Sequence, residues 1–164
     1  MQQTVYIDTS VIRYLTAPLS SDAVVRGCQE LTRQWWKSRC VREMTYISDA
    51  VLEEIKAGDP TLIGARMDIA EQLIYFPPDP EVQIFAELLI LGGGLNAKAR
   101  IPAQHIASAA LKELDVLLSW NCVDIANAQN CAVLRKLMVL KDLELPELVT
   151  PFALMENSYE DLQY

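Results

Sequence analysis

The stretch VYIDTS at residues 5–10 ends a short apolar run on an acid. Val5, Tyr6 and Ile7 have the character of a buried strand, and Asp8 is followed by two small hydroxyl residues. An aspartate in this position has two ordinary uses. Its side chain caps a helix that begins directly after the strand, or it serves as a ligand for something bound at the strand end. Local spacing alone gives the two interpretations equal weight.

Similar short apolar runs recur along the chain, separated by longer segments of helical period. The expected strands are residues 4–7, 45–48, 74–76, 116–119 and 148–149, and the expected helices are residues 22–42, 49–57, 81–91 and 102–114. Continuous apolarity is typical of parallel strands that are buried on both faces. The alternation of strands and helices therefore predicts an α/β fold with a parallel sheet covered on both sides. In the absence of repeats or linker-like segments, residues 1–164 are expected to form one domain.

Polar residues follow three of the expected strands. Asp8 follows the first strand, Glu53 and Glu54 lie in the helix after the second, and Asn121 and Asp124 follow strand 116–119. The carboxyl ends of parallel strands meet at one edge of a sheet, where ligands bind. Oxygen ligands of this kind suit Mg²⁺ or Mn²⁺, which can activate water and shield a phosphodiester.

Each of these residues also has an ordinary structural interpretation. Glutamates such as Glu53 and Glu54 are usually solvent-facing helix residues, and Asn121 and Asp124 are common turn formers. Their shared location at the strand ends favours the metal site over these separate roles.

Other chemistries are less well supported. A zinc site is improbable because there is one histidine, His105, and the four cysteines form no CxxC pair. No glycine-rich phosphate loop follows the first strand, and Ser10 stands where a haloacid-dehalogenase-like phosphatase has a second aspartate. His105 is interpreted as a structural hydrogen-bonding residue, with a nucleophile–base pair involving Cys122 or a serine as the alternative.

The charge distribution limits the kind of partner. A net charge of −8 argues against non-specific coating of nucleic acid. Basic residues and two tryptophans gather in residues 26–42, which fit either a solvated helix face or a surface for phosphate or a partner. No apolar run has the length of a membrane span, and no secretion signal is visible, so a cytoplasmic location is expected.

Several longer stretches together resemble the PIN domain, in the branch of VapC-type toxins. These stretches are VYIDTSVI at 5–12, TRQWW at 32–36, YISDAVLEEIKAGDP at 46–60, QHIASAALKELDVLLSWNCVDIANA at 104–128 and ELVTPFALM at 147–155. The resemblance covers nearly the whole chain. It implies a three-layer α/β/α sandwich with a central parallel sheet, and a ribonuclease that depends on Mg²⁺ or Mn²⁺.

The resemblance also implies which residues form the acidic site. Asp8 matches the first acid of the family, and Glu54 matches the second better than Glu53. The third acid usually opens a DAxHIA-like segment, but this chain has Pro102 there. Asn121 stands at the fourth position, which is often aspartate, and Asp124 occupies a place where relatives that read TWN carry histidine.

Partners follow from the same resemblance. It implies an RNA substrate, a cognate antitoxin that inserts an arginine into the acidic pocket, and a homodimer. Pro102 provides no side-chain oxygen, so a second hypothesis is a catalytically inactive PIN module that binds protein or RNA. A phosphatase-like hydrolase of small phosphoesters is a third, weaker alternative.

Overall fold

The computed structural model describes residues 2–160, and its centre is a five-stranded sheet in which every neighbouring pair of strands is parallel. The strands are β1 (Val5–Ile7), β2 (Thr45–Ser48), β3 (Ile74–Phe76), β4 (Val116–Leu118) and β5 (Glu147–Val149). Their order across the sheet is β3-β2-β1-β4-β5. The predicted parallel sheet and all five predicted strands are confirmed.

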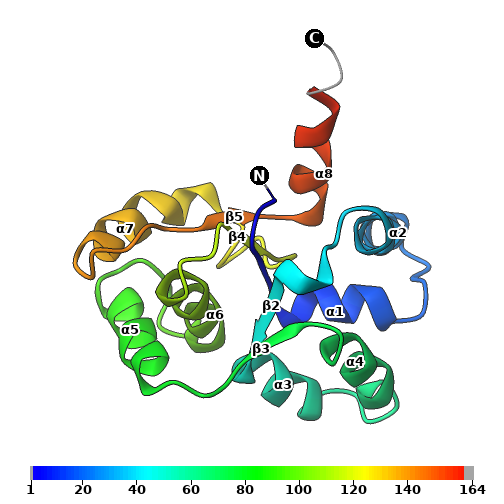
Figure 1. Cartoon of the computed structure of the whole chain (residues 1–164), viewed down its shortest axis with the longest axis horizontal. Helices are drawn as coiled ribbons and strands as arrows, with labels where there is room; N and C mark the ends of the chain where they lie inside the picture. The colour runs from blue at the N-terminus through cyan, green and yellow to red at the C-terminus, as the bar shows by residue number, and fades with distance from the viewer. Residues whose placement is uncertain (1, 161–164) are drawn as a thin grey trace.

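Within residues 2–160, eight α-helices accompany the sheet. They are α1 (Thr9–Thr16), α2 (Ala23–Ser38), α3 (Asp49–Lys56), α4 (Ile63–Ala70), α5 (Pro80–Leu91), α6 (Arg100–Leu111), α7 (Ala128–Val139) and α8 (Pro151–Glu160), with a short 3₁₀ helix at Arg42–Met44. Figure 1 shows α5 and α6 on one side of the strands and α1, α2 and α4 on the other. The three-layer α/β/α arrangement is therefore confirmed.

The central strands carry the core because they are apolar along their whole length. All three residues of β4 are fully buried, as are Tyr6 and Ile7 of β1. The edge strand β3 departs from the prediction of burial on both faces, since Ile74 and Tyr75 are 37% and 43% exposed. Edge strands have a neighbour on one side only, which explains this exposure.

Local signals fix the helix ends. Asp8, Asp22, Asp79 and Asn127 each accept backbone N–H groups at the start of the helix that follows. The cap of α2 is thus Asp22. Helix α5 ends at Leu91, as predicted, directly before Gly92–Gly94, and Gly93 has a positive φ of 80° that suits glycine.

The chain order places a topological switch in the middle of the sheet. From β1 the chain adds β2 and then β3 on one side, and it later adds β4 and β5 on the other side of β1. Crevices at such a switch point, outside the carboxyl ends of the strands, are where α/β sheets bind ligands. The residues after β1 and β4 are consequently the ones to inspect. Within residues 2–160, no helix is both long and apolar enough to cross a membrane.

Candidate active site

A small cavity of about 120 Å³ lies at this switch point, between the carboxyl ends of β1 and β4 and helices α3 and α6. Its walls combine two carboxylates, one arginine, one histidine and a short apolar side. The lining residues are Asp8, Thr9, Ser10, Arg13, Glu54, Ile101, Pro102, His105, Asn121 and Ile125. Three of the four predicted site residues, Asp8, Glu54 and Asn121, therefore meet in one cavity.

Asp8 is both a helix cap and a member of the cavity wall, so the two interpretations of VYIDTS do not compete. Its Oδ1 accepts the N–H of Ser10, at 3.0 Å, and the Ser10 hydroxyl. Its Oδ2 accepts the hydroxyl of Ser119, the residue after β4. Because donors from both sides of the switch point hold it, the Asp8 carboxylate has a fixed orientation.

Glu54 lies in the cavity wall, whereas Glu53 faces solvent. The Glu53 side chain is 71% exposed and pairs with Lys56 at 3.1 Å. Glu54 is 20% exposed, and its Oε1 accepts the Thr9 hydroxyl at 2.6 Å and His105 Nε2 at 2.7 Å. The choice of Glu54 over Glu53 agrees with this placement.

The charges around Glu54 keep it ionised. Burial alone would raise its pKa, but hydrogen bonds from His105 and Thr9, with the charges of His105 and Arg13, lower the pKa below its ordinary value. Arg13 Nη2 lies 3.8 Å from Glu54 Oε2, and the Arg13 side chain is 47% exposed. The guanidinium of Arg13 thus lies beside the second carboxylate of the cavity and is partly exposed to solvent.

Asn121 and Asp124 are placed together, but Asp124 does not line the cavity. The Asn121 Oδ1 accepts the N–H groups of Val123 and Asp124, at 3.2 and 3.0 Å, and its Nδ2 donates to Asp124 Oδ2 at 3.3 Å. The Asn121 oxygen is therefore already engaged in capping a turn. Pro102 is the third residue of α6, within the first turn where proline is tolerated, and it gives the cavity an apolar wall.

His105 has the predicted role of a structural hydrogen-bonding residue, but the sequence did not place it at the cavity. It is 2% exposed, and besides Glu54 it contacts Tyr6, whose Oη lies 2.7 Å from His105 Nδ1. Both ring nitrogens are thus used, and no serine or cysteine of residues 2–160 is paired with them. Its position three residues after Pro102, one turn along the same helix, was the available signal. Arg13 was also missed because α1 was not predicted.

The donor set of the cavity fits a magnesium-like ion that keeps most of its water. Asp8 and Glu54 are oxygen ligands in one cavity, and Mg²⁺ is commonly bound by one or two carboxylates together with substrate phosphates. Glu54 Oε2 accepts no hydrogen bond from the described residues and so keeps its lone pairs. Within residues 2–160, no three side chains of His, Cys, Asp or Glu converge as a ready metal cage.

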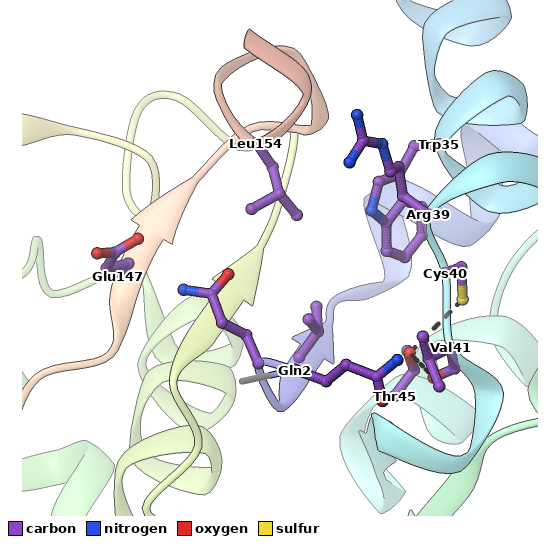
Figure 2. Close-up of a pocket in the computed structure, with 10 residues that line it drawn as sticks. Gln2, Trp35, Arg39, Cys40, Val41, Thr45, Glu147 and Leu154 are labelled. Atoms are coloured by element: carbon purple, nitrogen blue, oxygen red, sulfur yellow. Dashed lines mark hydrogen bonds between the residues drawn. The ribbon is translucent and has the colours of Figure 1, made fainter. Parts of the chain in front are cut away.

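A larger cavity, of about 360 Å³, lies at the opposite end of the sheet (Figure 2). It is lined by the first residues of β1, β2 and β5, with Arg39 on one side and Glu147 on the other. The nearby basic segment is partly used in structural contacts: Arg33 donates to the Ala17 carbonyl, and Arg42 donates to two carbonyls while stacking on Trp36. The pair of Asp8 and Glu54 lines the smaller cavity and not this one.

Comparisons with known proteins give the fold. The structure is similar to that of Mycobacterium tuberculosis VapC20, a Sarcin-Ricin loop cleaving toxin, with a TM-score of 0.54 and 15% identity over 69% of this chain and 86% of that one. It is also similar to a toxin–antitoxin complex from Klebsiella pneumoniae, with a TM-score of 0.54 and 16% identity over 77% of this chain and 93% of that one. No protein-family model and no curated protein matches the sequence. At these identities the likeness establishes the fold, and the resemblance to the VapC-type PIN fold is confirmed at that level.

Proposed function

We propose that this chain is a metal-dependent ribonuclease of the VapC type, which hydrolyses RNA phosphodiester bonds in the cavity between Asp8 and Glu54. The observation that carries the proposal is the meeting of these two carboxylates at the switch point of a VapC-like sheet. Asp8 and Glu54 would hold Mg²⁺ or Mn²⁺, which when bound would supply an activated water and offset phosphate charge.

The protein side chains divide the remaining work. Ser10 and Ser119 hold the Asp8 carboxylate in one orientation through their hydroxyls. Arg13 is half-exposed at the cavity and pairs only loosely with Glu54, so its guanidinium is available to donate to a phosphate oxygen of the substrate. Asn121, which donates to Asp124, lines the same cavity as a weaker ligand or water-positioning group.

The test is RNA cleavage in the presence of Mn²⁺, with wild-type protein and Asp8→Asn compared. A sarcin–ricin loop hairpin is a suitable first substrate because VapC20 is described as cleaving that loop. Wild-type cleavage that requires Mn²⁺ and disappears in Asp8→Asn supports the proposal. Cleavage that persists undiminished in Asp8→Asn overturns it.

Partners and location complete the proposal. The likeness to a chain from a toxin–antitoxin complex supports a cognate antitoxin for this protein. On the resemblance to the family, we expect an arginine of that partner to enter the acidic cavity and pair with Asp8 and Glu54. We propose a homodimer and a cytoplasmic location on the resemblance to the family. A small DNA-binding protein encoded next to this chain, and co-purifying with it, is the expected supporting result.

A second candidate is a PIN module that has kept the fold and lost the chemistry. The apolar Pro102 wall and the engaged oxygen of Asn121 favour it, because both reduce the number of oxygen ligands in the cavity. Calorimetric titration with Mn²⁺ separates the two candidates. Binding that is lost in Asp8→Ala supports the ribonuclease, and the absence of binding in a folded wild-type protein supports the inactive module.

A further inference from the structure

A chain of buried hydrogen bonds runs from the core to Glu54. Ser48 Oγ lies 2.7 Å from Tyr6 Oη, Tyr6 Oη lies 2.7 Å from His105 Nδ1, and His105 Nε2 lies 2.7 Å from Glu54 Oε1. Ser48, Tyr6 and His105 are 1%, 0% and 2% exposed. The chain joins β2, β1, α6 and α3, so four separate elements converge on one carboxylate.

The direction of the last hydrogen bond follows from the chemistry of its partners. A carboxylate oxygen accepts hydrogen bonds, so His105 Nε2 donates to Glu54 Oε1. Nδ1 then either accepts from the Tyr6 hydroxyl or donates to it, with Ser48 adjusting its rotor. Glu54 receives the same N–H in both arrangements.

The Ser48 hydroxyl belongs to this hydrogen-bond chain instead of capping helix α3. It occupies the N-cap position of α3, where a serine side chain normally accepts a backbone N–H. Here Ser48 makes no side-chain cap and its hydroxyl is bonded to Tyr6 instead. A helix that forgoes a stabilising cap for an interior contact points to a role for that contact beyond the stability of α3.

The buried hydroxyl of Tyr6 is not needed to fill the core. Tyr6 is fully buried, and a phenylalanine ring would fill the same space without a hydroxyl that needs partners. The Tyr6 hydroxyl is held by Ser48 on one side and His105 on the other, so it serves as a fixed hydrogen-bonding group. Fully satisfied buried networks of this kind fix the geometry of their members.

We propose that His105 and Tyr6 are positioning residues for the metal ligand Glu54, an inference that rests on the proposed function. They hold Oε1 toward His105, and Oε2 is left without a hydrogen bond from the described residues. Asp8 and Glu54 are the two carboxylates among the described lining residues, so the site depends strongly on the orientation of each one. Without His105, the Thr9 hydroxyl still donates to Oε1, but Glu54 can turn more readily toward Arg13, whose guanidinium is 3.8 Å away, and form a closer pair that competes with the ion.

The proposal is tested with Tyr6→Phe, His105→Ala and His105→Gln, and with Tyr46→Phe as the matched control. Tyr6→Phe removes only the hydroxyl, and the glutamine amide of His105→Gln can restore a donor to Glu54. Tyr46 lies beside Tyr6 in the sheet and stacks on Phe76, outside the acidic cavity. Mn²⁺ affinity is measured by titration without RNA, and folding by thermal unfolding.

The expected result is a loss of Mn²⁺ affinity of about tenfold in His105→Ala, within the range observed when a partner of a metal ligand is removed. Tyr6→Phe should show a smaller loss, His105→Gln should recover most of the affinity, and Tyr46→Phe should match the wild type. If His105→Ala does not fold, Tyr6→Phe and His105→Gln decide the question.

The possible negative results have different meanings. Mn²⁺ affinity that stays at the wild-type value in folded Tyr6→Phe and His105→Ala overturns the positioning role and leaves the proposed function intact. A similar loss of affinity in Tyr46→Phe also overturns the positioning role, because the effect would then be general destabilisation. Failure of the folded wild type to bind Mn²⁺ at all overturns the proposed function, and the positioning role falls with it.

Discussion

Replacing Arg13 with glutamine should weaken RNA cleavage without destabilising the fold. Arg13 Nη2 and Glu54 Oε2 are 3.8 Å apart, and the two side chains are 47% and 20% exposed. An ion pair this long and this open to solvent contributes only ~0.5 kcal/mol to stability. Arg100→Gln is a matched control, since Arg100 Nη2 also lies 3.8 Å from a carboxylate, that of Glu87, and lies outside the acidic cavity.

The effect on activity should be much larger than the effect on stability. A hydrogen bond from a guanidinium to a phosphate is worth about 1.5–3 kcal/mol, which corresponds to roughly a 10- to 100-fold loss in kcat/KM. Mn²⁺ affinity should rise rather than fall, because a positive charge beside Glu54 is removed.

Steady-state cleavage of an RNA hairpin, with Mn²⁺ titration of the same samples, measures both quantities. The reasoning is refuted if Arg13→Gln leaves kcat/KM unchanged, or if Arg100→Gln lowers it equally.

Two further changes test the site and the fold. Pro102→Asp places a third carboxylate at the cavity wall, within the first turn of α6. This variant should bind Mn²⁺ about tenfold more tightly in a titration, equivalent to about 1.4 kcal/mol. Unchanged affinity would mean that position 102 does not face the ion. Asp115 accepts the N–H and hydroxyl of Thr4, both at 2.8 Å, and these hydrogen bonds lower its pKa. The stabilising contribution of Asp115 is therefore present above its unfolded pKa of about 3.9 and is lost as pH falls through the lower folded value. Asp115→Asn should therefore lower the free energy of unfolding at neutral pH and lower it less in strong acid, as measured by urea denaturation. The loss at neutral pH should be at most about 1 kcal/mol, because the side chain is exposed to solvent. An equal loss at both pH values would contradict this prediction.

The parallel sheet could be predicted because strands buried on both faces are apolar without interruption. The residues of β1 and β4 are apolar without interruption, and no solvent-facing position breaks either run. Helix α1 was missed because Thr9–Thr16 is only eight residues long and begins Thr-Ser-Val-Ile, which reads as a continuation of the strand. The cap from Asp8 and packing against α2 determine it instead.

Four of the eight described helices, α1, α4, α7 and α8, were not predicted, and the ends of the predicted helices also differ from the structure. The helix expected over 22–42 ends at Ser38, and Arg42 instead belongs to a short 3₁₀ helix. The Arg42 guanidinium donates to the carbonyls of Trp36 and Cys40 and so satisfies the chain just beyond the helix. Long side chains that fold back in this way leave no clear mark in the local sequence.

The site was predictable in its members and less so in its contacts. Asp8 follows β1, Asn121 follows β4, and Glu54 lies in the helix after β2. The strands β2, β1 and β4 are neighbours in the sheet, so the meeting of the three residues follows from the topology. The Tyr6–His105 contact joins residues 99 positions apart, and no local pattern reveals it. Likewise, the inward or outward direction of the Asn121 oxygen depends on a turn that only the structure defines.

The most direct test of the metal site is the anomalous scattering of Mn²⁺ in crystals of the wild-type protein. The proposal predicts one anomalous peak in the cavity, within coordination distance of oxygens of both Asp8 and Glu54 and weakened or absent in Asp8→Asn. Crystals that bind Mn²⁺ only elsewhere, or show no peak in this cavity at millimolar Mn²⁺, would contradict it.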